Sequence, residues 1–297
     1  MNTAGTADAV WKRQAAQWRQ VGAPLRPSDE DLSLYESVLL GRVRANGPRL
    51  RGLLLGVTPE LAGLAWPAGT DLVAVDRCAD MIERVWPGYP TPGLGALLAD
   101  WLALPLPDRS RDVVIGDGSL NVIRYPDQTL GVLESAGRVL ADEGRVVVRV
   151  FARPEAAETS DEVFEAAMAG RIRGFHAFKL RLLMAVQGFE NIALRTGDVW
   201  ECWDREGPGA EALASRTGWP LEQISTIDAY RDQDTLYSFP TLAELRALVA
   251  KSPLVEVACI SGSYELAERC PRLVLARRQK TLRPAVCEGN PGSDPRV

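Results

Sequence analysis

The feature of this sequence that most restricts its fold is a series of short apolar runs that alternate with helical stretches from residue 51 onward. The runs lie at 53–56, 71–75, 97–99, 113–115 and 145–150, and helices are expected between them at 78–86 and 126–140. Continuous apolar strands separated by helices are typical of a parallel sheet with both faces covered. Because crossovers between parallel strands are right-handed, a doubly wound α/β sheet is expected.

The alternation is interrupted between residues 152 and 239. This segment has one strong helical pattern at 174–188 and two Trp-rich loops, but no clear alternation of strands. A helix at 240–250 and two apolar runs at 255–260 and 273–276 then follow. Residues 1–50 read as helical, with an N-cap at Ser28 for a helix through Leu40. The sequence therefore predicts one α/β domain that carries a helical N-terminal segment and a helical insert.

Composition restricts the function classes. The net charge of −5 makes a nucleic-acid partner unlikely, although a local basic patch remains open. The single histidine, and five cysteines without a C-x-x-C pair, leave no cluster for zinc or iron, although an Asp/Glu site for Mg²⁺ is not excluded. We find no signal peptide and no run of the roughly 20 apolar residues that a membrane span needs. A cytoplasmic protein with reduced thiols, without membrane or metal, is the expectation.

Acidic residues follow the predicted strands at the edge where such sheets bind ligands. Asp76 ends the second strand, and its two oxygens suit a ribose diol, as in both NAD and S-adenosylmethionine enzymes. A helix N-cap is the structural alternative for Asp76. Asp100 and Trp101 follow the third strand, where an Asp can accept from an adenine amino group and a Trp can flank the ring; a solvated loop Asp beside a core Trp is the alternative. No Tyr-x-x-x-Lys pair is present, which argues against a short-chain nicotinamide oxidoreductase.

Five stretches in order carry a resemblance: LLLGVTPEL (53–61), VAVDRCADMI (73–82), LADW (98–101), DVVIGDGSL (112–120) and RVLADEGRVVVR (138–149). Together they resemble the class I S-adenosylmethionine-dependent methyltransferases. The resemblance implies a Rossmann-like three-layer α/β/α sandwich whose seven-stranded, mostly parallel sheet has the order 3-2-1-4-5-7-6 and an antiparallel last strand. It implies S-adenosylmethionine as cofactor, held by Gly56, Thr58, Glu60, Asp76, Arg77, Asp100, Trp101, Asp117 and Gly118.

The first motif departs from the family pattern. The family carries an acid before Gly56 and two further glycines after it, where this chain has Leu54, Thr58 and Glu60. Glycines there let backbone N–H groups approach a ligand without a Cβ clash. One interpretation is a differently shaped loop, with Thr58 or Glu60 holding the methionine amino group, and it is favoured by the resemblance to a subgroup of methyltransferase-like proteins with a similar LGVTPE loop. Weakened cofactor binding or lost catalysis is the other interpretation.

The acceptor side is expected where the loop after the fourth strand meets the insert. Asp117 in that loop is the first candidate to orient or deprotonate an acceptor. His176 is the second, because its ordinary pKa suits proton transfer near neutrality, although packing between Phe175 and Phe178 is the structural alternative. Lys179 and Arg181 are candidates to bind an anionic substrate, and a solvated helix face is the structural alternative for both. A final list of open candidates contains Trp200, Trp203 and Trp219 for an aromatic pocket, Tyr264 for its rim, and Trp18 and Tyr35 for a lid.

These observations favour a methyltransferase that acts on oxygen or nitrogen of a small-molecule acceptor, as a monomer or homodimer. A degenerate methyltransferase fold that serves as a ligand-binding or interaction module is the alternative, and a nicotinamide oxidoreductase is a distant third. The expected divisions are an N-terminal helical cap (1–50), the cofactor-binding domain (51–151 and 240–279), a mainly helical insert on the acceptor side (152–239) and a disordered tail (280–297).

Overall fold

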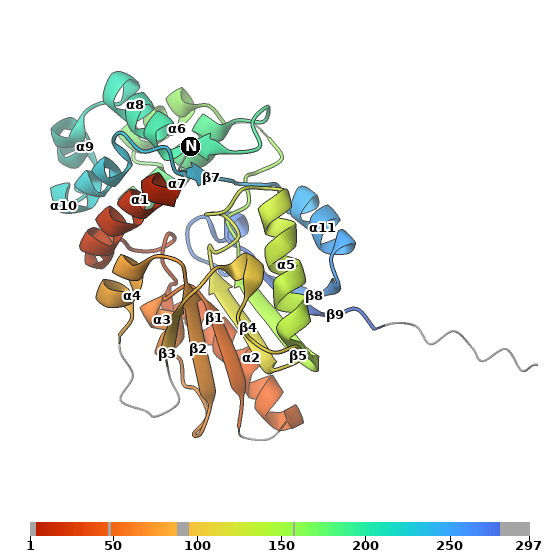
Figure 1. Ribbon diagram of the computed structural model, residues 1–297. Coiled ribbons are helices and arrows are strands. Elements are labelled where there is room, and N and C mark those ends of the chain that lie inside the picture. Colours follow the sequence, from red (N-terminus) through yellow and green to blue (C-terminus); the bar gives the residue numbers. More distant parts are fainter. Residues whose placement is uncertain (1–3, 47–48, 88–94, 157, 280–297) are drawn as a thin grey trace, which may run out of the picture.

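The computed structural model describes residues 4–46, 49–87, 95–156 and 158–279, and the expected tail lies outside them. Its main sheet has seven strands in the order β3-β2-β1-β4-β5-β9-β8 (Figure 1). Their bounds are β1 Arg51–Leu55, β2 Asp71–Asp76, β3 Gly95–Leu98, β4 Arg111–Asp117, β5 Leu140–Arg149, β8 Leu254–Ile260 and β9 Arg272–Arg277. β1 to β5 run parallel, and β9 is antiparallel to both of its neighbours. The predicted sheet is confirmed, with β8 and β9 as its sixth and seventh strands.

Helices cover both faces of this sheet because its strands alternate between two cores. Leu53 and Leu55 of β1 belong to one apolar cluster, which includes α5 (Asp127–Val139) and α11 (Leu242–Lys251). Leu54 belongs to the other, which includes α2 (Asp29–Asn46), α3 (Pro59–Ala62) and α4 (Ala79–Val85). Successive side chains of a strand point to opposite faces, so a fully buried strand needs apolar residues at every position. The uninterrupted Leu run is the local cause of the three-layer arrangement.

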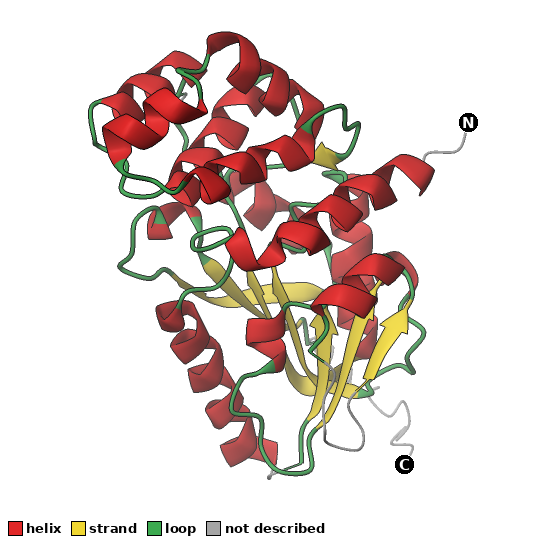
Figure 2. Ribbon diagram, turned by 90° about the vertical axis from the view of Figure 1, so that its left-hand side faces the viewer, coloured by secondary structure: helices red, strands yellow, loops and turns green. Residues whose placement is uncertain are grey.

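The helical segment between β5 and α11 forms a third core beyond one end of the sheet (Figures 1 and 2). It contains α6 Ser160–Met168, α7 Phe175–Gln187, α8 Thr196–Glu206, α9 Ala210–Thr217, α10 Leu221–Ile224 and η3 Ser225–Tyr230. Two short strands that the sequence did not suggest, β6 (Leu194–Arg195) and β7 (Leu236–Tyr237), pair with each other outside the main sheet. α7 begins and ends next to Gly174 and Gly188, as predicted from the sequence.

The N-terminal segment packs across both regions. α1 (Ala4–Gln17) continues into η1 (Trp18–Gln20) and contacts α4 on one side and η3 on the other. Ser28 lies directly before α2, where its hydroxyl accepts from the Asp31 N–H at 3.2 Å. This helix continues six residues past the predicted end at Leu40, because Gly41 is accommodated within it and no proline lies between Gly41 and Asn46. Two further turns, η2 Trp101–Ala103 and η4 Ala267–Arg269, complete the fold.

The division of the chain into cap, cofactor domain and insert stays a prediction.

Among the described helices, none is long and apolar enough to cross a membrane.

Candidate active site

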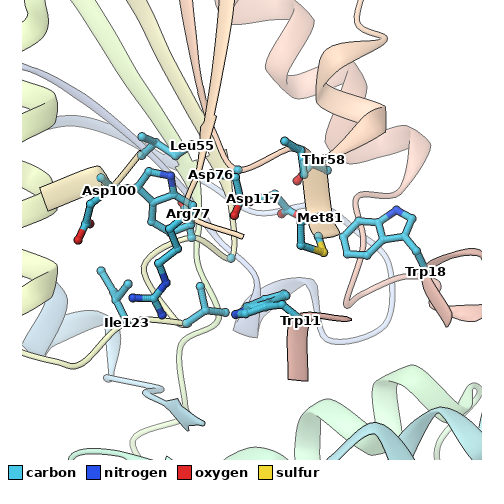
Figure 3. Close-up of a pocket in the computed structure, with 16 residues that line it drawn as sticks. Trp11, Trp18, Leu55, Thr58, Asp76, Arg77, Met81, Asp100, Asp117 and Ile123 are labelled. Carbon is cyan, nitrogen blue, oxygen red and sulfur yellow. The ribbon is translucent and has the colours of Figure 1, made fainter. Parts of the chain in front are cut away.

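A cavity lies at the carboxyl ends of the central strands, where open α/β sheets bind ligands. We call it the first cavity. Its walls come from the loops after β1, β2 and β4, from the turn after β3, and from α1 with η1 (Figure 3). The predicted cofactor residues that line it are Gly56, Thr58, Asp76, Arg77, Asp100, Trp101, Asp117 and Gly118. The structure therefore brings together every predicted cofactor residue except Glu60.

Gly56 follows β1 in a backbone conformation that only glycine adopts without strain. Its φ is +100°, and its N–H donates to the Val75 carbonyl at 2.8 Å. A Cβ built at this position would point into space bounded by Trp101 Cζ2 at 3.8 Å and Asp76 Oδ2 at 3.9 Å. The missing side chain thus keeps the wall between the predicted ribose and adenine residues open. This one glycine of the first motif is present for a structural reason.

Asp76 ends β2 as a buried carboxylate. Its Oδ1 accepts from the Cys78 N–H at 2.8 Å, but the N-cap of α4 is Cys78 itself, so the N-cap alternative for Asp76 is wrong. Its Oδ2 faces Gly56 across the wall of the first cavity. Burial raises the pKa of Asp76 to about 6, against the opposing effects of the Cys78 N–H and the Arg77 charge. Oδ2, on the Gly56 side of the cavity, is therefore the oxygen placed to accept from a ligand.

Asp100 and Trp101 are held by the turn η2. The Asp100 Oδ1 accepts from the Leu102 N–H at 2.9 Å, which leaves its second oxygen available. Trp101 donates its indole N–H to the Val75 carbonyl at 2.6 Å, which fixes the ring beside Gly56. A flat ring and a carboxylate on consecutive residues are thus presented at the same wall of the cavity.

Asp117 ends β4 inside a buried ion pair. Both of its oxygens accept from Arg149 of β5: Oδ2 from Nη2 at 3.0 Å, and Oδ1 from Nε. Arg149 also reaches Asp31 of α2, which bonds Arg272 of β9 as well. Burial raises the pKa of Asp117, while the guanidinium of Arg149 opposes that rise. A carboxylate whose two oxygens are already engaged is placed to orient neighbouring groups rather than to accept a proton.

A second cavity continues from the first toward the helical segment. The two share Trp11, Trp18, Thr58, Asp117, Gly118 and Val122. Beyond the shared residues, the second cavity is lined by side chains of α1, α7, η3 and β7, and by Phe239 before α11. Lys179 of α7 and Tyr230 of η3 are among its polar members beyond the shared wall, with Gln14, Asn121 and Tyr237. Sequence reasoning named Lys179 as a candidate, but it had no signal for Tyr230 or Tyr237.

His176 is not brought to either cavity. The side chain is 4% exposed, and its Nε2 bonds the Gln20 carbonyl at 2.8 Å. Burial, together with the Lys179 charge, lowers the pKa of His176 to about 4. A neutral imidazole of so low a pKa is a weak base at pH 7, and its position ties α7 to η1. The structure therefore favours the packing alternative for this residue.

Glu60 also lies outside the residues that line the two cavities. Its Oε1 accepts from Arg26 Nε at 2.6 Å, an ion pair that no local pattern in the sequence indicates. Its Oε2 is buried without a partner in the described part of the chain. The loop after β1 is thus closed by an ion pair where the family usually has glycines.

The remaining candidates pack elsewhere. Trp203 and Trp219 belong to the aromatic core of the helical segment, and the Trp200 indole bonds Asp228 at 3.0 Å. Tyr264 donates its hydroxyl to Asp31 at 2.9 Å. Tyr35 is buried, and its hydroxyl donates to the Gly116 carbonyl at 2.7 Å, so it is no lid. Of the expected lid residues, Trp18 alone lines the cavities. Within the described ranges no group of three or more His, Cys, Asp or Glu side chains is placed to hold a metal ion.

We compared the chain with families of known proteins and with solved structures. Residues 56–148 match the family described as a methyltransferase domain. No curated protein matches the chain. A Rhodobacter sphaeroides structure named as a candidate Zn-dependent alcohol dehydrogenase has 15% identity and a TM-score of 0.61, and the alignment covers 93% of this chain and 100% of the other. The CcbJ methyltransferase from Streptomyces caelestis has 13% identity and a TM-score of 0.53, with 91% and 98% covered.

A third structure is the Burkholderia thailandensis 1,6-didemethyltoxoflavin-N1-methyltransferase with bound 1,6-didemethyltoxoflavin and S-adenosylhomocysteine. It has 14% identity and a TM-score of 0.50, and the alignment covers 94% of this chain and 92% of the other. Identities this low show a shared fold and carry no substrate or metal from one chain to another. The family match begins at Gly56, directly after β1, and runs through β2, β3 and β4 to Val148 of β5, so it includes the strand-end loops that line the first cavity. Residues 56–148 thus match a methyltransferase domain, in agreement with the resemblance of the five sequence motifs to the class I S-adenosylmethionine-dependent methyltransferases.

Proposed function

We propose that this protein binds S-adenosylmethionine in the first cavity and transfers its methyl group to oxygen or nitrogen of a small molecule in the second. The observation that carries the proposal is that the two cavities meet at a shared wall that includes Thr58, Asp117 and Gly118. Methyl transfer needs a cofactor and an acceptor to meet in line at one point in a dry site. A cavity plugged by side chains of the helical segment would instead have favoured the non-catalytic module.

The residues of the first cavity fit the cofactor. The open space at Gly56 lies beside the free oxygen of Asp76, which suits a ribose diol. Asp100 has one unused oxygen and Trp101 a fixed ring, which suit an adenine amino group and face. Two buried polar atoms of lining residues, Trp18 Nε1 and Ser119 Oγ, have no partner in the described part of the chain. Such atoms support a ligand that completes their hydrogen bonds.

When bound, S-adenosylmethionine supplies a methyl group on a sulfonium centre. The residues of the protein then have two tasks: they position the acceptor against the methyl group, and they exclude water. Trp11 and Trp18, from α1 and η1, form walls common to both cavities. Asp117, fixed by Arg149, orients the acceptor at the shared wall. The loops at the strand ends thus form one side of the site, and α1 with η1 forms the side that covers it.

Further parts of the proposal concern the acceptor and the setting. The acidic net charge of −5 suits a small molecule better than a phosphate backbone, where affinity comes mainly from Lys and Arg. One structure of similar fold is named as a 1,6-didemethyltoxoflavin-N1-methyltransferase and holds 1,6-didemethyltoxoflavin, which supports a small-molecule acceptor. We place the protein in the cytoplasm because an odd number of cysteines, five, without a C-x-x-C pair suits reduced thiols.

Calorimetry with S-adenosylhomocysteine tests the cofactor site. We expect wild-type protein to bind, and Asp76→Ala to bind at least about tenfold more weakly, because hydrogen bonds to a charged group are lost. Asp80→Ala is the matched control, since this nearby, partly exposed carboxylate pairs with Arg84 on α4 and is absent from the residues that line the first cavity. No binding by the wild type, or equal affinity for Asp76→Ala, would refute the proposal.

Transfer of labelled methyl groups tests the acceptor class. The small-molecule fraction of a lysate is expected to take up label when wild-type protein is added. Label that enters only tRNA or protein fractions would show that the acceptor is a macromolecule. Binding of the cofactor product without transfer to any fraction would favour the ligand-binding module.

A further inference from the structure

Lys179 is a buried cation inside the second cavity. It lies in the first half of α7 and is 1% exposed, although it lines the cavity wall. Its Nζ donates to the Thr226 carbonyl at 2.7 Å and lies 3.4 Å from the Thr226 hydroxyl. The same atom sits 4.3 Å from the centroid of the Tyr230 ring. The ammonium is therefore fixed in place by η3 and cannot reach solvent by extension.

No carboxylate pairs with this ammonium among the described residues. Every ion pair found there has an arginine as its cation, and Asp228 raises the Lys179 pKa only from a longer distance. Leu183, Tyr237 and Phe239 provide an apolar or aromatic setting. A buried charge without an opposite charge is strongly disfavoured, so lysines in such positions are rare unless a partner is supplied. Thr226 occupies two of the three N–H donors of an ammonium at most.

We propose that Lys179 binds an acidic oxygen of the methyl acceptor, so that the acceptor is a small, largely apolar or aromatic molecule carrying a carboxylate or a similarly acidic hydroxyl. The inference rests on the proposed function, because it takes the second cavity as the acceptor site. An anion would supply the missing charge and accept the third hydrogen bond. The apolar walls would hold the rest of the molecule, as in most small-molecule sites.

Burial lowers the pKa of Lys179 to about 7 in the protein without a ligand. An anion at the ammonium favours the charged form, so binding near pH 8 is expected to take up close to one proton. Five other titratable side chains lie on the elements around this lysine or on the shared wall. They are His176 of α7, Asp228 and Tyr230 of η3, Tyr237 of β7, and Asp117 at the end of β4. His176 stays neutral near pH 8, and burial keeps both tyrosines protonated.

Calorimetry on the complex with S-adenosylhomocysteine tests the inference with three one-ring ligands: benzoate, benzyl alcohol and benzylamine. At about pH 6.5, wild-type protein is expected to bind benzoate at least about tenfold more tightly than the other two. Lys179→Met should abolish this preference, and Lys179→Arg should restore part of it. Lys251→Met, at an exposed lysine of α11, should keep it. Repeating the titration near pH 8 in buffers of different ionisation enthalpy measures the proton taken up, which Lys179→Met should lose.

Equal affinity for benzoate and benzyl alcohol, no binding of benzoate, or an unchanged preference in Lys179→Met would overturn the inference. Folding of the variant is checked by its affinity for S-adenosylhomocysteine, which should equal that of wild type because Lys179 is absent from the first cavity. If the variant has lost this affinity, the comparison moves to Lys179→Arg, whose benzoate preference must survive. Failure with benzoate while the cofactor product still binds refutes this inference alone. Failure of the wild type to bind the cofactor product refutes the proposed function instead.

Discussion

Affinity for the cofactor is expected to depend on pH through Asp76. Its carboxylate is 9% exposed, and burial raises its pKa to about 6. A ribose diol donates to the ionised form, so protonation of Asp76 removes the acceptor that the ligand needs. At about pH 5 roughly a tenth of the Asp76 side chains are ionised, whereas nearly all are ionised at about pH 7.5. The expected loss is therefore about tenfold in affinity, or about 1.4 kcal/mol.

Calorimetry with S-adenosylhomocysteine at several pH values checks this expectation. Wild-type affinity should rise from about pH 5 to pH 7 and then level off. Asp76→Asn keeps the shape and one acceptor oxygen but cannot titrate, so its affinity should be lower throughout and nearly independent of pH. Asp80→Asn should reproduce the wild-type profile. The reasoning is refuted if the wild-type curve is flat, or if Asp76→Asn retains the same slope, since another group would then titrate.

Three further outcomes follow from buried contacts. Asp31→Ala should lower the free energy of unfolding, measured in urea, by about 3–5 kcal/mol, because it leaves buried arginine charges without their shared carboxylate. The control Asp80→Ala, at a partly exposed carboxylate, should lower it by under about 0.5 kcal/mol. Similar losses in the two variants would contradict this expectation. Gly118→Ala should weaken the binding of S-adenosylhomocysteine, because Gly118 has a φ of +61° and the new Cβ would lie 2.8 Å from Cε2 of the Phe151 ring. The control Gly170→Ala, at a φ of +70° with open space around it, should lose only about 1–2 kcal/mol of stability and keep its affinity. His176→Gln should leave methyl transfer unchanged in labelled-methyl assays, and a folded variant without turnover would restore the catalytic role.

The cofactor half of the site could be predicted from the sequence because each of its residues is placed locally. Asp76, Asp100 and Asp117 each come at the end of a strand or directly after it, and the edge at which parallel strands end is common to all of them. The strands themselves are readable because the buried sheet needs apolar residues on both faces. Glu60 shows where this reasoning stops, since its ion pair with Arg26 joins segments 34 residues apart.

The acceptor half could not be predicted in the same way. Its cavity is assembled from α1, α7, η3 and β7, which come together only through the packing of the helical segment. His176 and Lys179 stand three residues apart on α7, yet one bonds η1 and the other bonds η3. Helical spacing placed them on one face but gave no information on what covers that face. The role of each side chain depends on the segment that accepts its hydrogen bond, and that segment is distant in the sequence.

The ion pair of Asp117 with Arg149 has a consequence for how such a site can change during evolution. Arg149 also bonds Asp31, and Asp31 bonds Arg272, so four buried charges balance one another across α2, β4, β5 and β9. Replacing any one of them alone leaves a buried charge uncompensated, which is costlier than replacing a pair by apolar residues. In descendants of this chain, positions 31, 117, 149 and 272 should therefore vary together or not at all. New acceptor preferences would then arise through α1, α7 and η3, whose cavity side chains can be exchanged one at a time.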